Sequence, residues 1–455
     1  MNQEIIDKYN VSTPRYTSYP PANYFGALTG EDYIKHVDES NQSSNNNISF
    51  YIHMPFCRRL CLYCGCNSYA MSNKETVDAY IKALHKEIDL VAEHISKDRR
   101  ISQIHYGGGS PTAIPTADLK ALNDHLLSLF PTIERPEIAI ECHPGFLTAE
   151  DWEQLLECRF NRFSIGVQDT DPKVLKAVNR QEPEIPLADI FAILRSREVS
   201  INMDFLFGLP YQTPESFAES ISIARELRPD RLVTFSYGHV PWVFPRQKLL
   251  EKLGLPQPEE KNRMFTMAAQ TLEQAGYNQL GLDHFVLPTD ELYIARQQKM
   301  LRRNFQGYCT LRTTGQVYAF GVSGISQLDN AYAQNGKDIP TYIQSINDGK
   351  LYVQKGYTLS EGEKVVREVV EALMCNYHVD FNTVAQRLGL SNGDEVKSHC
   401  NYDIEKLREM QADGIITLTD QSITLTDERS PFVRNVAAAL DPMMLNTTRQ
   451  FSKPI

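Results

Sequence analysis

Residues 48–66 read ISFYIHMPFCRRLCLYCGC, an apolar run followed at once by a loop that carries four cysteines. The run over residues 48–53 predicts a buried β-strand, because short segments rich in β-branched and aromatic residues favour strands. Active sites of α/β folds lie in the loops that follow the carboxyl ends of parallel strands. We therefore expect this strand and its loop to define both the fold and the position of the site.

Three of the loop cysteines, Cys57, Cys61 and Cys64, form a Cys-x3-Cys-x2-Cys triplet. Thiolates are the soft ligands of zinc and of iron–sulfur clusters. Structural zinc usually takes two separated pairs of ligands, and the sequence has no matching pair downstream. Three thiolates on a [4Fe–4S] cluster leave one iron open, the arrangement needed to chelate S-adenosylmethionine (SAM) and cleave it reductively to a 5′-deoxyadenosyl radical. The triplet therefore favours such a cluster over zinc or a metal-free turn.

Two neighbours of the triplet are further candidates. Tyr63 lies between the last two cysteines, where its ring can stack on an adenine. Cys66 is a possible fourth ligand, but the triplet already suffices, so we expect the cluster to form without it.

The composition bounds the class of protein. The chain has 455 residues and a formal net charge of −11, which argues against nucleic acid or an anionic membrane as the main partner. The sequence has no apolar run of membrane-spanning length and no visible secretory signal, which predicts a cytoplasmic location. Nothing in it demands more than a monomer. One tight cysteine cluster among nine cysteines indicates metal or redox chemistry rather than a disulfide framework.

Strand-like and helical segments alternate after the cysteine loop, which predicts an α/β fold with a parallel sheet. Pattern alone leaves open a full barrel, a partial barrel or an open doubly wound sheet. The expected strands cover residues 48–53, 101–106, 138–142, 162–167, 201–206 and 231–237, with a seventh possible at 278–282.

The pattern of expected helices and strands changes near Leu359. Helical patterns over residues 365–374, 381–388 and 404–410 precede two short strands around Asp420, which is typical of a winged-helix-like module. A dense stripe of lysine and arginine is lacking, so we do not expect this module to bind DNA.

Further motifs follow the cysteine loop in a specific order, and together they resemble the oxygen-independent coproporphyrinogen III oxidases (dehydrogenases) of the radical SAM superfamily over nearly the whole chain. None of these motifs is specific to the family by itself, but their order and spacing together are. They are PRYTSYP at 14–20, CGCN at 64–67, YGGGSPT at 106–112, NRFSIGVQD at 161–169, DFLFGLP at 204–210, DHF at 283–285 and NFQGY at 304–308.

The resemblance implies a partial (β/α)6 TIM-like radical SAM barrel with a C-terminal, mostly helical, winged-helix-like domain. It divides the chain into an arm and linker (1–47), the barrel (48–290), an extension completing the substrate site (291–358) and the C-terminal domain (359–455). It implies oxidative decarboxylation of two propionate side chains of coproporphyrinogen III to vinyl groups, giving protoporphyrinogen IX in haem biosynthesis. It also implies two SAM molecules, with an electron donor and an acceptor that the sequence does not identify.

The resemblance carries over residue by residue. Cys57, Cys61 and Cys64 match the cluster ligands. The positions that match contacts to the cluster-bound SAM are Tyr51, Gly108, Glu141 and Ile325. The positions that match the second SAM site are Tyr63, Gly109, Ser110, Gln168, Arg180, Asp204 and Gly238.

Some assignments stay open. His53 is either a site residue or a satisfied core histidine, and the basic run of Lys299, Arg302 and Arg303 either holds propionates or is a solvated face. The family often has Glu-x-Asp-Pro where this chain has Glu-Cys-His-Pro at 141–144, and alanine where it has Gly238. The alternatives are a haem-binding chaperone of the same superfamily and a radical SAM enzyme acting on another tetrapyrrole.

Overall fold

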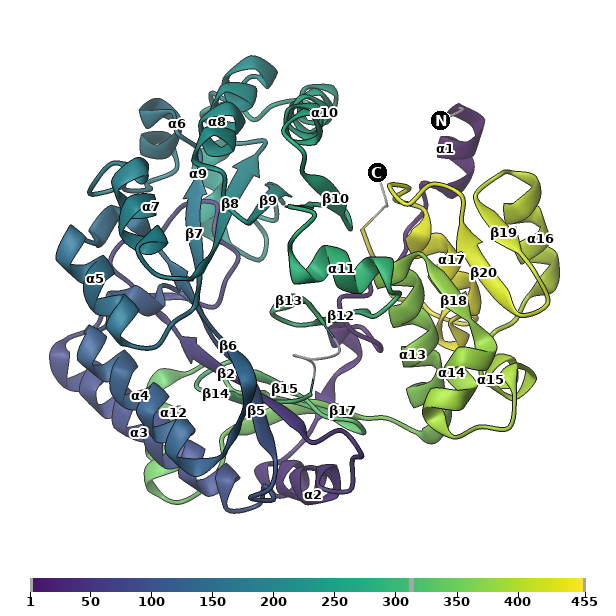
Figure 1. The fold of residues 1–455 in the computed structure, drawn as a ribbon, viewed down its shortest axis with the longest axis horizontal. Coiled ribbons are helices and arrows are strands. Elements are labelled where there is room, and N and C mark those ends of the chain that lie inside the picture. The colour runs from purple at the N-terminus through teal and green to yellow at the C-terminus, as the bar shows by residue number, and fades with distance from the viewer. Residues whose placement is uncertain (1–2, 311–314, 453–455) are drawn as a thin grey trace.

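Six parallel strands form the centre of a curved sheet, as the sequence predicts. The structure, a computed structural model, describes residues 3–310 and 315–452. Figure 1 shows the strands as an arc with helices on its outer side and its open side toward the C-terminal helices. The adjacent parallel strands are, in order, β2 (Asn47–Met54), β5 (Arg100–Gly108), β6 (Thr132–Cys142), β7 (Arg162–Gln168), β8 (Ser200–Phe207) and β9 (Arg231–Ser236).

The sheet continues at both edges and is an open, partial barrel. On one side β14 (Gln316–Phe320) pairs with β2 in parallel, so the predicted extension adds strands to the main sheet. The other strands are antiparallel: β15 (Ile325–Gln327), β16 (Ala331–Asn335), β17 (Val353–Thr358) and β1 (Gly26–Ala27) beyond β14, and β11 (His284–Val286) and β10 (Asn278–Leu280) beyond β9.

Helices between the strands cover the outer face. Thr148 and Asp151 form a capping box at the start of one of these helices, and Thr213 caps another, which begins at Pro214. The helices of this layer are α3 (Lys74–Ala92), α4 (Thr116–Leu129), α5 (Ala149–Glu157), α6 (Pro172–Ala177), α7 (Leu187–Arg195), α8 (Pro214–Leu227), α10 (Pro258–Gln274) and α12 (Ile339–Asn347).

The alternation along each strand separates the core from the site. In β7, Phe163, Ile165 and Val167 are buried in the main hydrophobic core. The intervening Ser164, Gly166 and Gln168 point to the other face of the sheet and line a cavity. Because successive side chains of a strand face opposite ways, one strand serves both the core and the interior of the barrel.

A second core lies in the C-terminal unit. The three predicted helices and the hairpin are present, and α15 and α17 add to them. The elements are α13 (Glu361–Asn376), β18 (His378–Asp380), α14 (Phe381–Leu388), α15 (Gly393–His399), α16 (Ile404–Ala412), β19 (Ile416–Leu418), β20 (Ser422–Leu425), α17 (Val433–Leu440) and η5 (Pro442–Met444).

The N-terminal segment is more ordered than the expected arm. It contains two helices, α1 (Gln3–Tyr9) and α2 (Gly30–Ser40). Tyr16 and Tyr19 are buried in the C-terminal core, where their hydroxyls donate to the two carboxylate oxygens of Asp441 at 2.8 and 3.0 Å. The first and last parts of the chain therefore form one packed unit.

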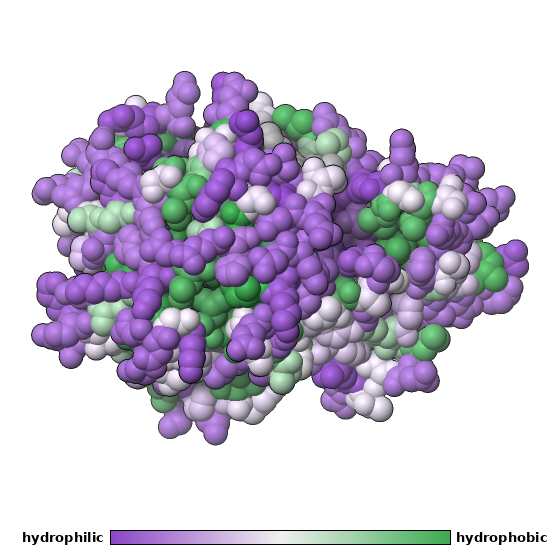
Figure 2. Space-filling model, turned by 90° about the horizontal axis from the view of Figure 1, so that it is seen from below, coloured by the Kyte–Doolittle hydropathy of each residue, from purple (hydrophilic) through white to green (hydrophobic). Residues whose placement is uncertain are grey.

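The remaining elements are short, and no described helix combines the length and apolarity needed to cross a membrane. Figure 2 shows hydrophilic side chains over most of the face seen from below, with hydrophobic patches between them. The short elements are η1 (Ala22–Tyr24), β3 (Phe56–Cys57), β4 (Tyr69–Ala70), η2 (Pro111–Ala113), η3 (Pro144–Phe146), η4 (Pro245–Gln247), α9 (Lys248–Glu251), α11 (Glu291–Gln297), β12 (Leu301–Asn304) and β13 (Gly307–Thr310).

Candidate active site

A cavity of about 170 Å³ opens at the carboxyl ends of the central strands, beside the cysteine loop. The predicted site residues that line it are Cys57, Cys61, Tyr63, Cys64, Gly108, Gly109, Ser110, Glu141, Gln168, Arg180 and Asp204. They come from the loop after β2 and from β5, β6, β7, the segment after α6, and β8. Residues up to 147 positions apart in the sequence therefore converge at the active edge of the sheet, as the strand order requires.

Main-chain contacts hold the cysteine loop against the barrel. The Leu62 amide donates to the Val178 carbonyl at 2.9 Å, and the Asn179 side chain donates to the Leu60 carbonyl at 2.9 Å. On the other side Arg246 donates to the Cys64 carbonyl at 2.9 Å. Because polar groups on both sides satisfy the loop backbone, the thiols are held in place by the protein itself.

The three predicted ligands lie in one loop beside the cavity. A [4Fe–4S] cluster binds each thiolate through a different iron, so three thiols that hold one need not converge on a single point. Gly109 leaves the room that a cluster requires, since a Cβ atom there would lie 3.0 Å from the Cys57 sulfur.

The thiols differ in their local electrostatics. A hydrogen bond from the Cys66 side chain is the main cause that lowers the pKa of Cys64 to about 6, and the Arg246 charge also contributes. Burial raises the pKa of Cys57 to about 11. The Cys66 amide lies 3.4 Å from the Cys64 sulfur, and the Cys66 side chain is exposed. Cys66 thus supports Cys64 in this geometry, and its role as a ligand stays open.

Arg180 is the most informative side chain of the cavity. It is 8% exposed, and its guanidinium donates to the Tyr63 hydroxyl at 3.1 Å and to the Gly166 carbonyl, with the Cys61 sulfur at 3.5 Å. No carboxylate of the described residues forms an ion pair with it. A buried cation without an anion is costly, so this site fits a ligand that brings a carboxylate.

Asp204 offers a buried acceptor to the same cavity. The Ser164 hydroxyl and the Asn202 amide donate to its two oxygens at 2.8 Å each. Burial raises the pKa of this carboxyl, opposed by those hydrogen bonds. Together with Gln168, which adopts a left-handed φ of 71°, it provides groups for the polar parts of a nucleoside.

Glu141 lines the cavity, and His105 and Tyr51 lie behind it. His105 Nε2 lies 3.2 Å from Glu141 Oε1, and its ring stacks on Tyr51 with centroids 5.9 Å apart. A Cβ atom at Gly107 would lie 2.7 Å from the Glu141 carboxylate. The glycine turn therefore lets the carboxylate reach the cavity.

His53 is a satisfied core histidine. Its Nδ1 contacts the Tyr51 hydroxyl at 3.1 Å, and its Nε2 contacts the Asn67 carbonyl at 3.0 Å. Burial lowers its pKa, so it is held neutral. Of the two interpretations that the sequence leaves open, this geometry fits the structural one.

Three predicted site residues, Tyr51, Gly238 and Ile325, do not line the cavity. Gly238 follows β9, and its carbonyl accepts from the Gln247 amide at 3.4 Å, while the same amide donates to the Tyr63 carbonyl at 2.9 Å. Ile325 lies on β15 opposite Gln334. Their contacts to SAM stay predictions.

Some residues that line the cavity were not predicted from the sequence. Ser164 and Gly166 alternate with Gln168 along β7, so period two alone would have found them. His143 has no such signal; burial, followed by the charge of Arg180, lowers its pKa to about 3.

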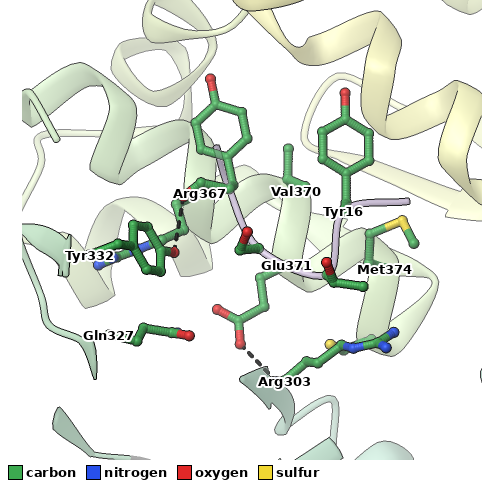
Figure 3. A pocket seen from close by; sticks show the side chains of 12 residues that line it. Tyr16, Arg303, Gln327, Tyr332, Arg367, Val370, Glu371 and Met374 are labelled. Carbon is green, nitrogen blue, oxygen red and sulfur yellow. Dashed lines mark hydrogen bonds between the residues drawn. The ribbon is translucent and has the colours of Figure 1, made fainter. Parts of the chain in front are cut away.

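The basic run of Lys299, Arg302 and Arg303 matches neither interpretation fully. It is not a set of cations free to bind propionates, and it is not a fully solvated face. Arg302 pairs with Glu368 at 2.9 Å and with Glu371 at 3.3 Å. Arg303 lines a second cavity between the arm and α13, where its backbone amide donates to Glu371 at 3.0 Å (Figure 3). That cavity holds about 20 Å³, the room of a single water molecule.

Comparison with known proteins bears on this geometry. The radical SAM superfamily matches residues 51–224. The oxygen-independent coproporphyrinogen III oxidase of Salmonella typhimurium is 36% identical over 99% of this chain and 98% of its own length, and that of Synechocystis is 33% identical over 99% and 97%. A solved structure of coproporphyrinogen III oxidase from Escherichia coli, described as a radical SAM enzyme, is 31% identical with a TM-score of 0.86 and covers 97% of this chain and 98% of that one.

Proposed function

This chain belongs to the family of oxygen-independent coproporphyrinogen III oxidases in the radical SAM superfamily, and we propose that it decarboxylates two propionate side chains of coproporphyrinogen III to vinyl groups. Each conversion removes carbon dioxide, one hydrogen atom and one electron from the substrate. The product is protoporphyrinogen IX, and the electrons leave to an external acceptor. This is the oxidoreductase chemistry of haem biosynthesis.

One observation carries the proposal at the level of the site. The buried Arg180 faces the same cavity as the three thiols and lacks a carboxylate partner among the described residues. A ligand that contains a carboxylate and sits beside a cluster satisfies it, and SAM is such a ligand.

The chain's own residues would divide the work as follows. Cys57, Cys61 and Cys64 would hold a [4Fe–4S] cluster, and Glu141 would accept from a hydroxyl or ammonium group of the first SAM. Arg180 would bind the carboxylate of a second SAM, and Asp204 would accept from its polar groups. When bound, cluster and SAM supply a carbon-centred radical that removes a hydrogen atom from an unactivated carbon.

The test is a reconstitution without oxygen. We would supply iron, sulfide, reductant, SAM, an electron acceptor and coproporphyrinogen III, and quantify 5′-deoxyadenosine and porphyrin products by chromatography. The Cys57, Cys61 and Cys64 to Ala triple variant is the inactive control, and Cys158→Ala with Cys400→Ala is its matched control outside the cavity.

The outcomes separate the alternatives. Protoporphyrin formed together with deoxyadenosine supports the proposal. Deoxyadenosine without protoporphyrin points to another tetrapyrrole substrate. Neither product, with tight haem binding in a titration, points to a haem chaperone and contradicts the proposal.

Finer features of the enzyme are also part of the proposal. We propose a second SAM beside the cluster-bound one, and the unpaired Arg180 supports this because it fits a ligand carboxylate. The nine cysteines are free thiols, which fits a cytoplasmic location, where thiols stay reduced. We expect a monomer that takes electrons from a separate donor.

A further inference from the structure

Four exposed or partly exposed cations lie in or beside the cysteine loop, apart from Arg59, which lines the inner cavity. We call Arg58, Arg246, Lys248 and Lys337 the loop cations. Arg58 belongs to the loop, Arg246 donates to the Cys64 carbonyl, and Lys248 begins α9 two residues later. Lys337 reaches the loop from the segment before α12 and lines the same outer hollow as Cys66. A positive rim of this kind is unusual in a chain of net charge −11.

The loop cations are not neutralised by the protein. Within residues 3–310 and 315–452, none of them forms an ion pair, whereas Lys8 and Lys397 do so elsewhere on the surface. The nearby acids are engaged in other contacts. Asp338 accepts from the Thr341 amide at 2.9 Å at the start of α12, and Glu251 accepts from His239 at 2.9 Å.

An exposed apolar tip stands beside this rim. Trp242 is 77% and Val243 57% exposed. Their segment is anchored on the loop: a Cβ atom at Gly65 would lie 3.3 Å from the Phe244 ring, and Gln247 donates to the Tyr63 carbonyl at 2.9 Å. An exposed tryptophan held on a fixed segment is a typical centre of a protein interface.

The loop itself separates this surface from the active site. An outer hollow of about 330 Å³ is lined by residues 65–68, Phe244, Pro245, Arg246 and Lys337. Cys66 and Ser68 also line the inner cavity. A partner on the outer side thus lies next to the thiols without entering the substrate cavity.

We propose that the loop cations and the Trp242–Val243 tip form the docking surface for a small acidic protein that carries single electrons, such as a flavodoxin. The inference rests on the proposed function, because that chemistry needs an external electron at the cluster. In the step, the reduced carrier loses one electron and the cluster gains it, and no bond forms or breaks between the proteins. Charge complementarity selects an acidic carrier, since the rim is positive and unpaired.

The test compares two routes of reduction in the cluster-loaded protein. We would mix reduced flavodoxin with the wild type, with Lys248→Glu plus Lys337→Glu, and with Trp242→Ser, and follow the cluster's visible absorbance by stopped flow. Lys406→Glu, an exposed lysine on α16, is the matched control. Calorimetric titration with oxidised flavodoxin measures binding apart from electron transfer.

We expect the double charge reversal to lower the bimolecular reduction rate about tenfold at low salt and much less at high salt. Trp242→Ser should weaken flavodoxin binding about tenfold or more. Lys406→Glu should match the wild type, and dithionite should reduce all four proteins equally. Unchanged flavodoxin rates and affinities in both variants would overturn the proposal.

Three other results would reassign the surface and so also overturn it. A raised KM for coproporphyrinogen III with normal flavodoxin reduction would make it a substrate entrance. A dimer lost on Trp242→Ser in sedimentation would make it a self-association face. Binding to anionic lipid vesicles in place of flavodoxin would make it a membrane contact. If the dithionite-reduced protein forms no protoporphyrin, that result contradicts the proposed function but not the docking proposal, because cluster reduction by flavodoxin is measured separately.

Discussion

The two ends of the parallel strands hold buried charges in opposite states. At the amino ends, Arg162 on β7 bonds to Glu137 on β6 at 2.5 Å, and Arg231 on β9 bonds to Asp290 at 2.7 Å. At the carboxyl ends, Arg180 has only neutral acceptors and a thiol as described partners, and Asp204 has only neutral donors. Both ends are polar and largely buried, yet only one end is electrostatically complete.

The difference between the two ends distinguishes charged residues that stabilise the fold from charged residues that bind a ligand. Charges that pair with each other contribute to folding and need no counter-ion from a ligand, although Arg162 Nη1 and Arg231 Nη2 are buried without a hydrogen-bond partner among the described residues. Charges left without a counter-ion weaken the ligand-free protein and strengthen the bound one. Substitutions at the amino ends should therefore affect unfolding, and those at the carboxyl ends should affect binding.

The largest effect is expected at the thiols. The Cys57, Cys61 and Cys64 to Ala variant should lose the cluster's visible absorbance, its iron and all product formation. Its melting temperature should match that of the iron-free wild type, because the loop backbone is held by other contacts. Iron and sulfide retained at wild-type levels would refute the cluster assignment.

At the amino ends, Asp290→Asn should lower the free energy of unfolding by about 3 kcal/mol, since buried Arg231 loses its nearer carboxylate and keeps only Glu291 at 3.6 Å. Chemical denaturation measures the loss, and SAM affinity should stay unchanged. A combined Arg231→Met and Asp290→Asn variant should recover part of the stability. A loss of SAM affinity that equals the loss of stability would erase the distinction between the two ends.

Glu87 provides a third case, a buried carboxylate held only by neutral donors. It accepts from the Gly321 amide, Asn335 and the Tyr342 hydroxyl at 2.7 Å each, and burial raises its pKa to about 7. The folded state favours the protonated form, so this contribution is fully present below about pH 4.5 and is lost as the pH rises through about 7.

Replacing Glu87 with Gln removes that titration. The difference in stability between Glu87→Gln and the wild type should shift in favour of Gln, by at most about 3 kcal/mol, between pH 4.5 and 7.5. Thermal unfolding across this range measures it. Parallel pH profiles of the two proteins would show that the carboxyl does not titrate there.

The smallest effect is expected at Arg180. Arg180→Met should weaken SAM binding about 10- to 100-fold, because it removes a charge-assisted contact. The free energy of unfolding should change by no more than about 1 kcal/mol, since the lost hydrogen bonds are offset by removing an unpaired buried charge. Equilibrium dialysis with SAM gives the affinity and stoichiometry. Unchanged SAM stoichiometry together with unchanged turnover would remove Arg180 from the site.

The sequence predicted the central strands because each is a short apolar run between helical segments. The resemblance assigned Glu141, Gln168 and Asp204 to the site, and they meet because residues at the carboxyl ends of adjacent parallel strands lie side by side. Arg180 follows α6 and not a strand, so its place in the cavity was expected only from the resemblance. Hydrophobic periodicity predicts helices and strands, but it does not predict where a residue in the loop after a helix lies in the fold.

Other features could not be predicted because they depend on packing between distant segments. The pairing of Arg302 with Glu368 and Glu371 requires the β12–β13 hairpin to lie on α13. The environment of His53 depends on the main-chain carbonyl of Asn67. We expected only an arm and linker over residues 1–47, but α2 begins at Gly30 with a capping box at Thr29 and Asp32.

The packing of the N-terminal segment against the C-terminal unit has a consequence during translation of the chain. Arg434 donates to the carbonyls of Thr13 and Pro14, and Asp441 accepts from Tyr16 across 425 residues of sequence. Residues 13–16 therefore lack these C-terminal partners until residues 434–441 have been translated, whereas Tyr332, which donates to the Tyr19 carbonyl, is made earlier. At about 5–20 residues per second this delay is roughly 20–85 s. Completion of the C-terminal core is thus the event that releases residues 13–16 from exposure to chaperones and proteases, and a chain that stops early keeps these residues open to them.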